Sequence, residues 1–234
     1  MQIAVPRATL PFLEYSVYHS GMFELLVVVF IYSVVFGADY LWFRLNPRTY
    51  NYVSRGTYLT FLLGQLALIY LYFSRLQSFF NDLTTEVVAL SILLGALIAF
   101  TVVFHVNHLK ICHGTTRTEL CLTPGYLFVK GADIMFQQLC FLLIALIIKD
   151  IVEIGALRYL LFAVVVLIMH TPLEIGIGKQ WFQFYIFFSI VLTAPFFYTY
   201  TSLELFWPAL YIHTLGYVGM WLALADMEGR KVHN

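Results

Sequence analysis

Residues 131–142 read GADIMFQQLCFL and open an apolar run that continues to Ile148. Two adjacent glutamines, Gln137 and Gln138, therefore lie inside a segment with the length and composition of a membrane-spanning helix. A glutamine amide has two N–H donors and a carbonyl acceptor, and hydrocarbon offers none of them a partner. Two later apolar runs each carry one histidine, His170 and His213. We expect these four side chains to meet in one polar site between helices.

The composition places the chain among membrane proteins. Its 234 residues are 61% hydrophobic and 11% charged, whereas soluble domains contain about 25% charged residues. The formal net charge is zero, which leaves no basic face for nucleic acid. The three cysteines are scattered without a CxxC pair, so neither a disulfide framework nor a zinc knuckle is indicated. The composition predicts an all-α, polytopic helical bundle that forms a single domain over 1–234.

Seven apolar segments are near the roughly 20 residues needed to cross a bilayer. They cover 22–43, 56–74, 87–105, 131–148, 154–170, 181–198 and 203–225. Residues 9–19 alternate aromatic and polar side chains, and fit either a short interfacial helix or a poorly ordered tail. If this segment also crosses the membrane, the count becomes eight.

Four local features give further expectations. Residues 106–130 are predicted to be a polar connection, and Asp133 to lie near the start of the fourth span, where the helix dipole favours an acid. Pro172 predicts a helix end just beyond His170. Pro208 is expected to start or kink the last span. Aromatic residues near span ends, Tyr198 and Tyr200 among them, are typical of an interfacial belt.

The basic residues predict the orientation. Under a seven-span count, nine fall on one side: Arg44, Arg48, Arg55, Lys110, Arg117, Lys130, Lys179, Arg230 and Lys231. Four fall on the other side: Arg7, Arg75, Lys149 and Arg158. The positive-inside rule then places the first set, and with it the C-terminus, in the cytoplasm.

A possible metal site follows the third predicted span. His105 and His108 are three residues apart on one face of a helix end, and His113 lies shortly after them. Three ligands alone are a weak signal, and a polar cap at the cytoplasmic membrane surface is the favoured interpretation. No cofactor is otherwise indicated, although two histidines in a bundle, such as His170 and His213, could in principle ligate a haem.

At this point the chain resembles a known family. The order Phe-Gln-Gln-Leu-x-Phe at 136–141, a histidine ending the next run, and Ser-Leu-x-x-x-x-Pro-Ala-x-x-x-His at 202–213 are similar to the CPBP family. These are the CAAX-prenyl-protease and bacteriocin-processing intramembrane enzymes, also called the Abi family. The resemblance covers 131–217, and implies a core over 131–225 preceded by variable N-terminal spans over 1–130.

The family's motifs match this chain in part. They comprise two glutamates followed by an arginine, a phenylalanine with a histidine four residues on, and a histidine with an asparagine four residues on. In the family a glutamate activates the water that attacks the scissile bond. Two positions match, His170 and His213. Five positions differ: Gln137 and Gln138 replace the glutamates, Leu142 the arginine, Val166 the phenylalanine and Tyr217 the asparagine.

The loss of the glutamates bears directly on the chemistry. A glutamine amide cannot take up a proton near neutral pH, and general-base catalysis needs a group that can. The sequence therefore favours a pseudoprotease that binds or scaffolds a partner membrane protein or peptide within the bilayer. Two alternatives stay open: a divergent or metal-dependent intramembrane protease using His170 and His213, and a structural subunit of a larger membrane complex.

Overall fold

The computed structural model describes residues 10–45, 55–80, 124–174 and 179–217, and every regular element in these ranges is a helix. The main helices are α1 (Leu10–Leu45), α2 (Arg55–Leu76), α4 (Pro124–Ile151), α5 (Gly155–Glu174) and α6 (Lys179–Thr201). A short 3-10 helix, η2 (Gln77–Phe80), follows α2, and residues 207–217 form one further helical segment. The predicted all-α class is confirmed for this part of the chain.

Three of these helices are long and apolar enough to cross a membrane. The spans are Ser20–Leu41 in α1, Tyr58–Phe79 in α2 and η2, and Lys130–Ile151 in α4. They correspond to the first, second and fourth predicted spans, while Gly155–His170 in α5 is a shorter apolar helix at the place of the fifth. The third predicted span, 87–105, lies outside the described residues. The structure is thus that of a membrane protein.

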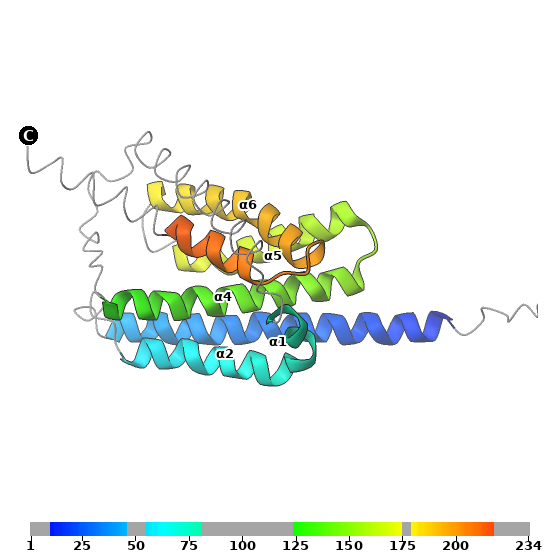
Figure 1. The fold of residues 1–234 in the computed structure, drawn as a ribbon, viewed down its shortest axis with the longest axis horizontal. Coiled ribbons are helices and arrows are strands. Elements are labelled where there is room, and N and C mark those ends of the chain that lie inside the picture. Colours follow the sequence, from blue (N-terminus) through cyan, green and yellow to red (C-terminus); the bar gives the residue numbers. More distant parts are fainter. Residues whose placement is uncertain (1–9, 46–54, 81–123, 175–178, 218–234) are drawn as a thin grey trace, which may run out of the picture.

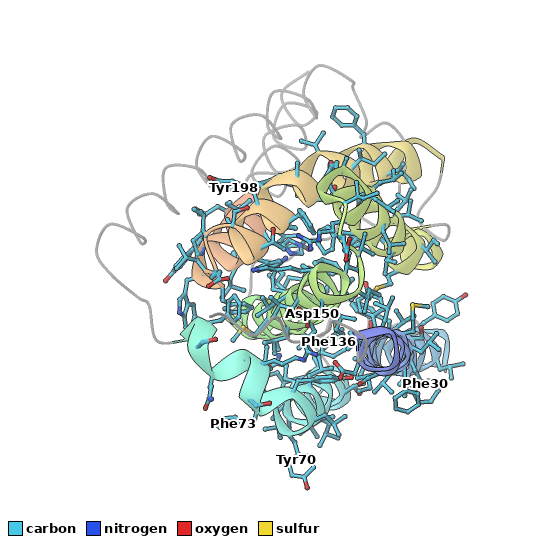
Figure 2. The ribbon with its side chains drawn as sticks, turned by 90° about the vertical axis from the view of Figure 1, so that its right-hand side faces the viewer. Phe30, Tyr70, Phe73, Phe136, Asp150 and Tyr198 are labelled. Carbon is cyan, nitrogen blue, oxygen red and sulfur yellow. The ribbon has the colours of Figure 1, made fainter. Side chains whose placement is uncertain are left out.

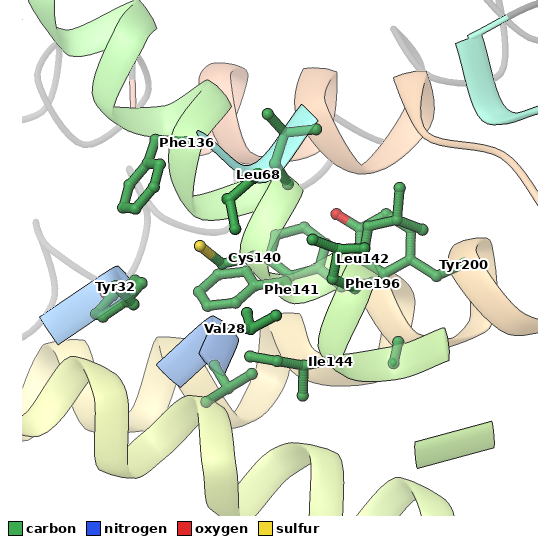
Figure 3. Close-up of a cluster of buried hydrophobic side chains, with 14 of the residues drawn as sticks. Val28, Tyr32, Leu68, Phe136, Cys140, Phe141, Leu142, Ile144, Phe196 and Tyr200 are labelled. Carbon is green, nitrogen blue, oxygen red and sulfur yellow. The ribbon is translucent and has the colours of Figure 1, made fainter. Parts of the chain in front are cut away.

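Helix α4 is the interior helix of the bundle. Figure 1 shows it between α1 and α2 on one side and α5 and α6 on the other, and it contacts all four. In α4, 78% of the apolar span is buried, against 33% in α1 and 28% in α2. Figure 3 shows how α4 side chains such as Phe136, Phe141 and Leu142 meet side chains from neighbouring helices in one core. A helix that is apolar all round belongs in such an interior position.

The outer helices turn apolar side chains away from this core. Figure 2 shows Phe30 of α1, Tyr70 of α2 and Tyr198 of α6 at the rim of the bundle, and all three are exposed. The exposed residues of α5 recur every three or four positions: Leu157, Leu160, Val164 and Ile168. Such stripes form the surface that lipid would cover, because soluble monomers rarely expose apolar patches of this extent.

Two glycines allow α4 to approach its neighbours closely. A Cβ atom built on Gly64 of α2 would lie 2.7 Å from the ring of Phe136 and 2.8 Å from Cγ2 of Val35. A Cβ atom on Gly21 of α1 would collide with Ile151 at the end of α4. Small residues at such positions permit the close packing on which helix association in membranes depends.

An ion-pair cluster joins three helices at one end of the bundle. Arg75 of α2 lies 3.0 Å from Glu24 of α1 and 2.5 Å from Asp150 of α4. Nearby, Lys149 donates to Glu204 at 3.0 Å and to the Thr201 carbonyl at 3.2 Å. Arg75 and Lys149 therefore lie at the same end, as their assignment to one side of the membrane requires.

Several helix boundaries differ from those predicted. Helix α4 begins at Pro124, seven residues before Gly131, so the last part of the expected polar connection is helical and Asp133 lies in the third turn. The charged pair at 149–150, which lies just beyond the predicted span 131–148, belongs to the last turn of α4. Helix α5 continues through Pro172 to Glu174, so the predicted stop after His170 is wrong.

The first and last described helices also differ from expectation. Residues 10–19 are neither a separate interfacial helix nor a tail, because α1 is continuous from Leu10 to Leu45. The last helical segment starts at Trp207 and not at 203, with Pro208 in its first turn. Proline is favoured there because the first turn of a helix does not use its backbone N–H groups.

Candidate functional site

Gln138 is at the centre of a buried polar network that joins three helical segments. Its Nε2 donates to Nδ1 of His213 at 2.7 Å, and its Oε1 accepts a hydrogen bond from the Tyr200 hydroxyl. Gln138 and Tyr200 are fully buried. Both ends of the amide are therefore occupied by protein groups, one from α6 and one from the segment 207–217. In this arrangement Nδ1 of His213 is the acceptor, so the proton of a neutral ring resides on Nε2.

Gln137 belongs to a second polar group on an adjacent face of α4. Its Nε2 donates to Oδ1 of Asp133 at 2.7 Å, and Lys130 donates to Oδ2 at 2.5 Å. The Lys130 ammonium also lies 4.7 Å from the centre of the Tyr217 ring, so this group connects α4 to the helical segment 207–217. The spacing explains the group, because residues 130, 133 and 137 are three and four positions apart on one helix face. Asp133 is thus held by an ion pair and an amide, and not by the helix N-terminus.

His170 is connected to the Gln138 network through a row of ring contacts. Its ring is 5.5 Å from the ring of Phe141, Phe141 lies 6.4 Å from Phe196, and Phe196 lies 5.8 Å from His213. The structure therefore places both histidines around the same stretch of α4 as the two glutamines.

The groups of this arrangement exchange hydrogen bonds, and the imidazole of His213 is in addition a proton acceptor. The network around Gln138 contains an amide, a phenol and an imidazole, and no carboxylate. The described carboxylate nearest to it along α4, Asp133, already accepts from Lys130 and Gln137. Leu142, at the position of the family's arginine, and Val166, at that of its phenylalanine, are both buried in the apolar core.

Two participants were not anticipated as site residues. Tyr200 was expected in the interfacial belt, but it is fully buried while Tyr198 is 57% exposed. Residues two apart on a helix point about 200° away from each other, so only one of the two tyrosines could face lipid. Lys130 was counted only as a loop charge. Its spacing of three from Asp133 was the available signal for an ion pair.

The structure gives no position to the candidate metal ligands. His105, His108 and His113 lie outside the described residues. Within the ranges that the structure covers, no group of three or more histidine, cysteine, aspartate or glutamate side chains is placed to hold a metal ion.

Comparisons with protein families, curated proteins and solved structures found no match to this chain. What the site does is therefore argued from its residues.

Proposed function

We propose that this chain is a multi-pass membrane protein, with seven spans, whose core resembles that of the CPBP proteases but binds a partner instead of cleaving it. The partner would be a transmembrane helix or peptide segment held within the bundle. The observation that carries the proposal is the occupied amide of Gln138. A hydrolase needs a proton acceptor at this position, and the amide is not one.

The geometry around the site supports binding in a second way. Gln137, Asp133 and Lys130 add a polar group next to the Gln138 network, within a helix that is otherwise apolar. Placing polar side chains inside the membrane costs free energy, and such residues usually have a functional role. Hydrogen bonds between membrane helices contribute about 0.6–2 kcal/mol each, which is enough to orient a bound segment.

The proposal predicts that the purified protein does not hydrolyse transmembrane peptides. We expect the double change Gln137→Ala and Gln138→Ala to weaken binding of a leucine-rich transmembrane peptide in vesicles by about 3- to 30-fold, the equivalent of one membrane hydrogen bond. Binding is read by energy transfer between labelled protein and labelled peptide, and cleavage by mass spectrometry of the same samples.

One outcome would reverse this conclusion in favour of an enzyme. If the unmodified protein cleaves the peptide, and His213→Ala abolishes cleavage while the thermal unfolding transition is retained, then a base other than the glutamines is at work. The control is Gln65→Ala in α2. The Gln65 amide donates to the Ala132 carbonyl at 2.7 Å, outside the Gln138 network.

The proposed topology has the C-terminus in the cytoplasm. A reporter fused after Asn234 is therefore expected to read as cytoplasmic, and a tag in the loop around Gln77 to Asp82 as external. The reason is the excess of lysine and arginine on the C-terminal side and the position of Arg75 and Lys149 at the opposite end. Labelling of both sites from the same side would contradict the seven-span arrangement.

A further inference from the structure

One buried polar atom in the site has no hydrogen-bond partner in the part of the chain that the structure describes. Gln137 is 5% exposed, and among the described residues no donor lies within hydrogen-bonding distance of its Oε1. The orientation of the amide follows from its other end. The Asp133 carboxylate can only accept, so Nε2 must face Asp133 and the carbonyl oxygen must point away from it. A buried acceptor left in this state costs free energy, which a suitable donor would recover.

The surroundings of this oxygen define what donor it would accept. Asp133 and Lys130 form an ion pair with no net charge, so the site neither needs nor offsets a further charge. A charged group brought to this depth would remain uncompensated. The Asp133 carboxylate oxygens and the Gln137 carbonyl oxygen are all hydrogen-bond acceptors. The group that completes the site must therefore be a donor. The matching group is therefore a neutral donor, a hydroxyl or a carboxamide.

The site is not sealed at its outer end. Lys130 retains 27% of its side-chain exposure, and Tyr217 and His170 are only partly buried. Gly131, one residue after Lys130, is exposed. Gln137 and Asp133 thus form the buried end of a polar group whose outer member, Lys130, reaches the surface of the described bundle.

We propose that Gln137 Oε1 is the recognition point for a hydroxyl or carboxamide side chain on the bound transmembrane segment. This inference rests on the proposed binding function, and it names the chemistry of the partner: an apolar helix with a serine, threonine, asparagine or glutamine near its centre. The alternative occupant is a resident water molecule, for which the side chain of the partner would be irrelevant.

The test compares three synthetic peptides in vesicles of phosphatidylcholine. Each is a leucine-rich transmembrane helix, and the central residue is asparagine, serine or leucine. Binding to the full-length protein is measured by energy transfer. We expect the asparagine and serine peptides to bind about 3- to 30-fold more tightly than the leucine peptide. The variant Gln137→Met, which keeps the length of the side chain and removes the acceptor, is expected to abolish that difference.

The control variant is Gln65→Met, which removes a membrane glutamine outside this group and should leave the preference intact. Equal binding of all three peptides, or a preference that survives Gln137→Met, would overturn the inference and leave the water as the occupant. No binding of any peptide would instead overturn the proposed function itself.

A second measurement does not depend on the folding of the variant. A photoreactive group placed beside the central asparagine should label residues 133–141 of α4 in the unmodified protein. Labels confined to the exposed faces of α1 or α2 would overturn the inference.

Discussion

Gly64→Leu is expected to lower the free energy of unfolding by about 3 kcal/mol or more, because overpacking a well-filled core typically costs 1–3 kcal/mol and a leucine adds four heavy atoms. The side chain has no space to enter. A Cβ atom on Gly64 would lie 2.7 Å from Phe136 and 2.8 Å from Val35, and both of these side chains are buried. Phe136 cannot easily move aside, since its ring also packs against Tyr32, Phe36 and Phe61.

The matched control for this change is Gly37→Leu. Gly37 is also a helical glycine in a membrane span, but nothing lies within 4 Å of a Cβ built on it. Leucine there should be neutral or stabilising by up to about 1 kcal/mol, because it favours the helix more than glycine does. Thermal unfolding in detergent measures both variants. Equal stabilities would show that α2 does not pack against α4 through Gly64.

Gln138→Leu is expected to destabilise the bundle by about 2–4 kcal/mol, because it leaves two buried groups without their partner and each costs about 1–3 kcal/mol. The groups are the Tyr200 hydroxyl and Nδ1 of His213. Membrane hydrogen bonds often contribute less, since the separated groups find other partners. Tyr200 is fully buried, and after the change its remaining acceptor is the backbone carbonyl of residue 138, 3.4 Å from the hydroxyl in the unmodified protein.

The variant Tyr200→Phe distinguishes the loss of a hydrogen bond in this network from the loss of side-chain volume. Tyr200→Phe removes one hydroxyl and should cost about 1 kcal/mol. In the double variant the two costs should not add fully, because Gln138→Leu has already removed the side-chain acceptor of that hydroxyl. Additive unfolding free energies would contradict the hydrogen bond between Tyr200 and Gln138.

The apolar pattern of the sequence was sufficient to predict much of this fold. Runs of about 20 apolar residues predicted the spans in α1, α2 and α4, because the thickness of the bilayer fixes their length. Hydropathy did not predict the start of α4 at Pro124 or the continuation of α5 through Pro172. There the helices continue past the hydrophobic run, and hydropathy does not report on helical backbone beyond it.

The site was predicted less completely than the spans. The adjacent glutamines and the two histidines drew attention because they are polar groups in apolar runs, and the structure brings Gln138 and His213 into contact. The sequence did not predict that Gln137 would hydrogen-bond to Asp133 and not to a histidine. Adjacent residues on a helix point about 100° apart, so which neighbour each one meets depends on the rotation of α4 within the bundle. Packing decides that rotation.

The arrangement of α4 also sets an order of assembly during synthesis. The helices that cover one side of it, α1 and α2, leave the ribosome first, whereas the partners of Gln138 follow 62 and 75 residues later. Helix α4 can therefore pack against α1 and α2 before Tyr200 and His213, the partners of Gln138, have been synthesised. Because chains fold from the N-terminus as they are made, the polar network around Gln138 closes only after residue 213 has been synthesised.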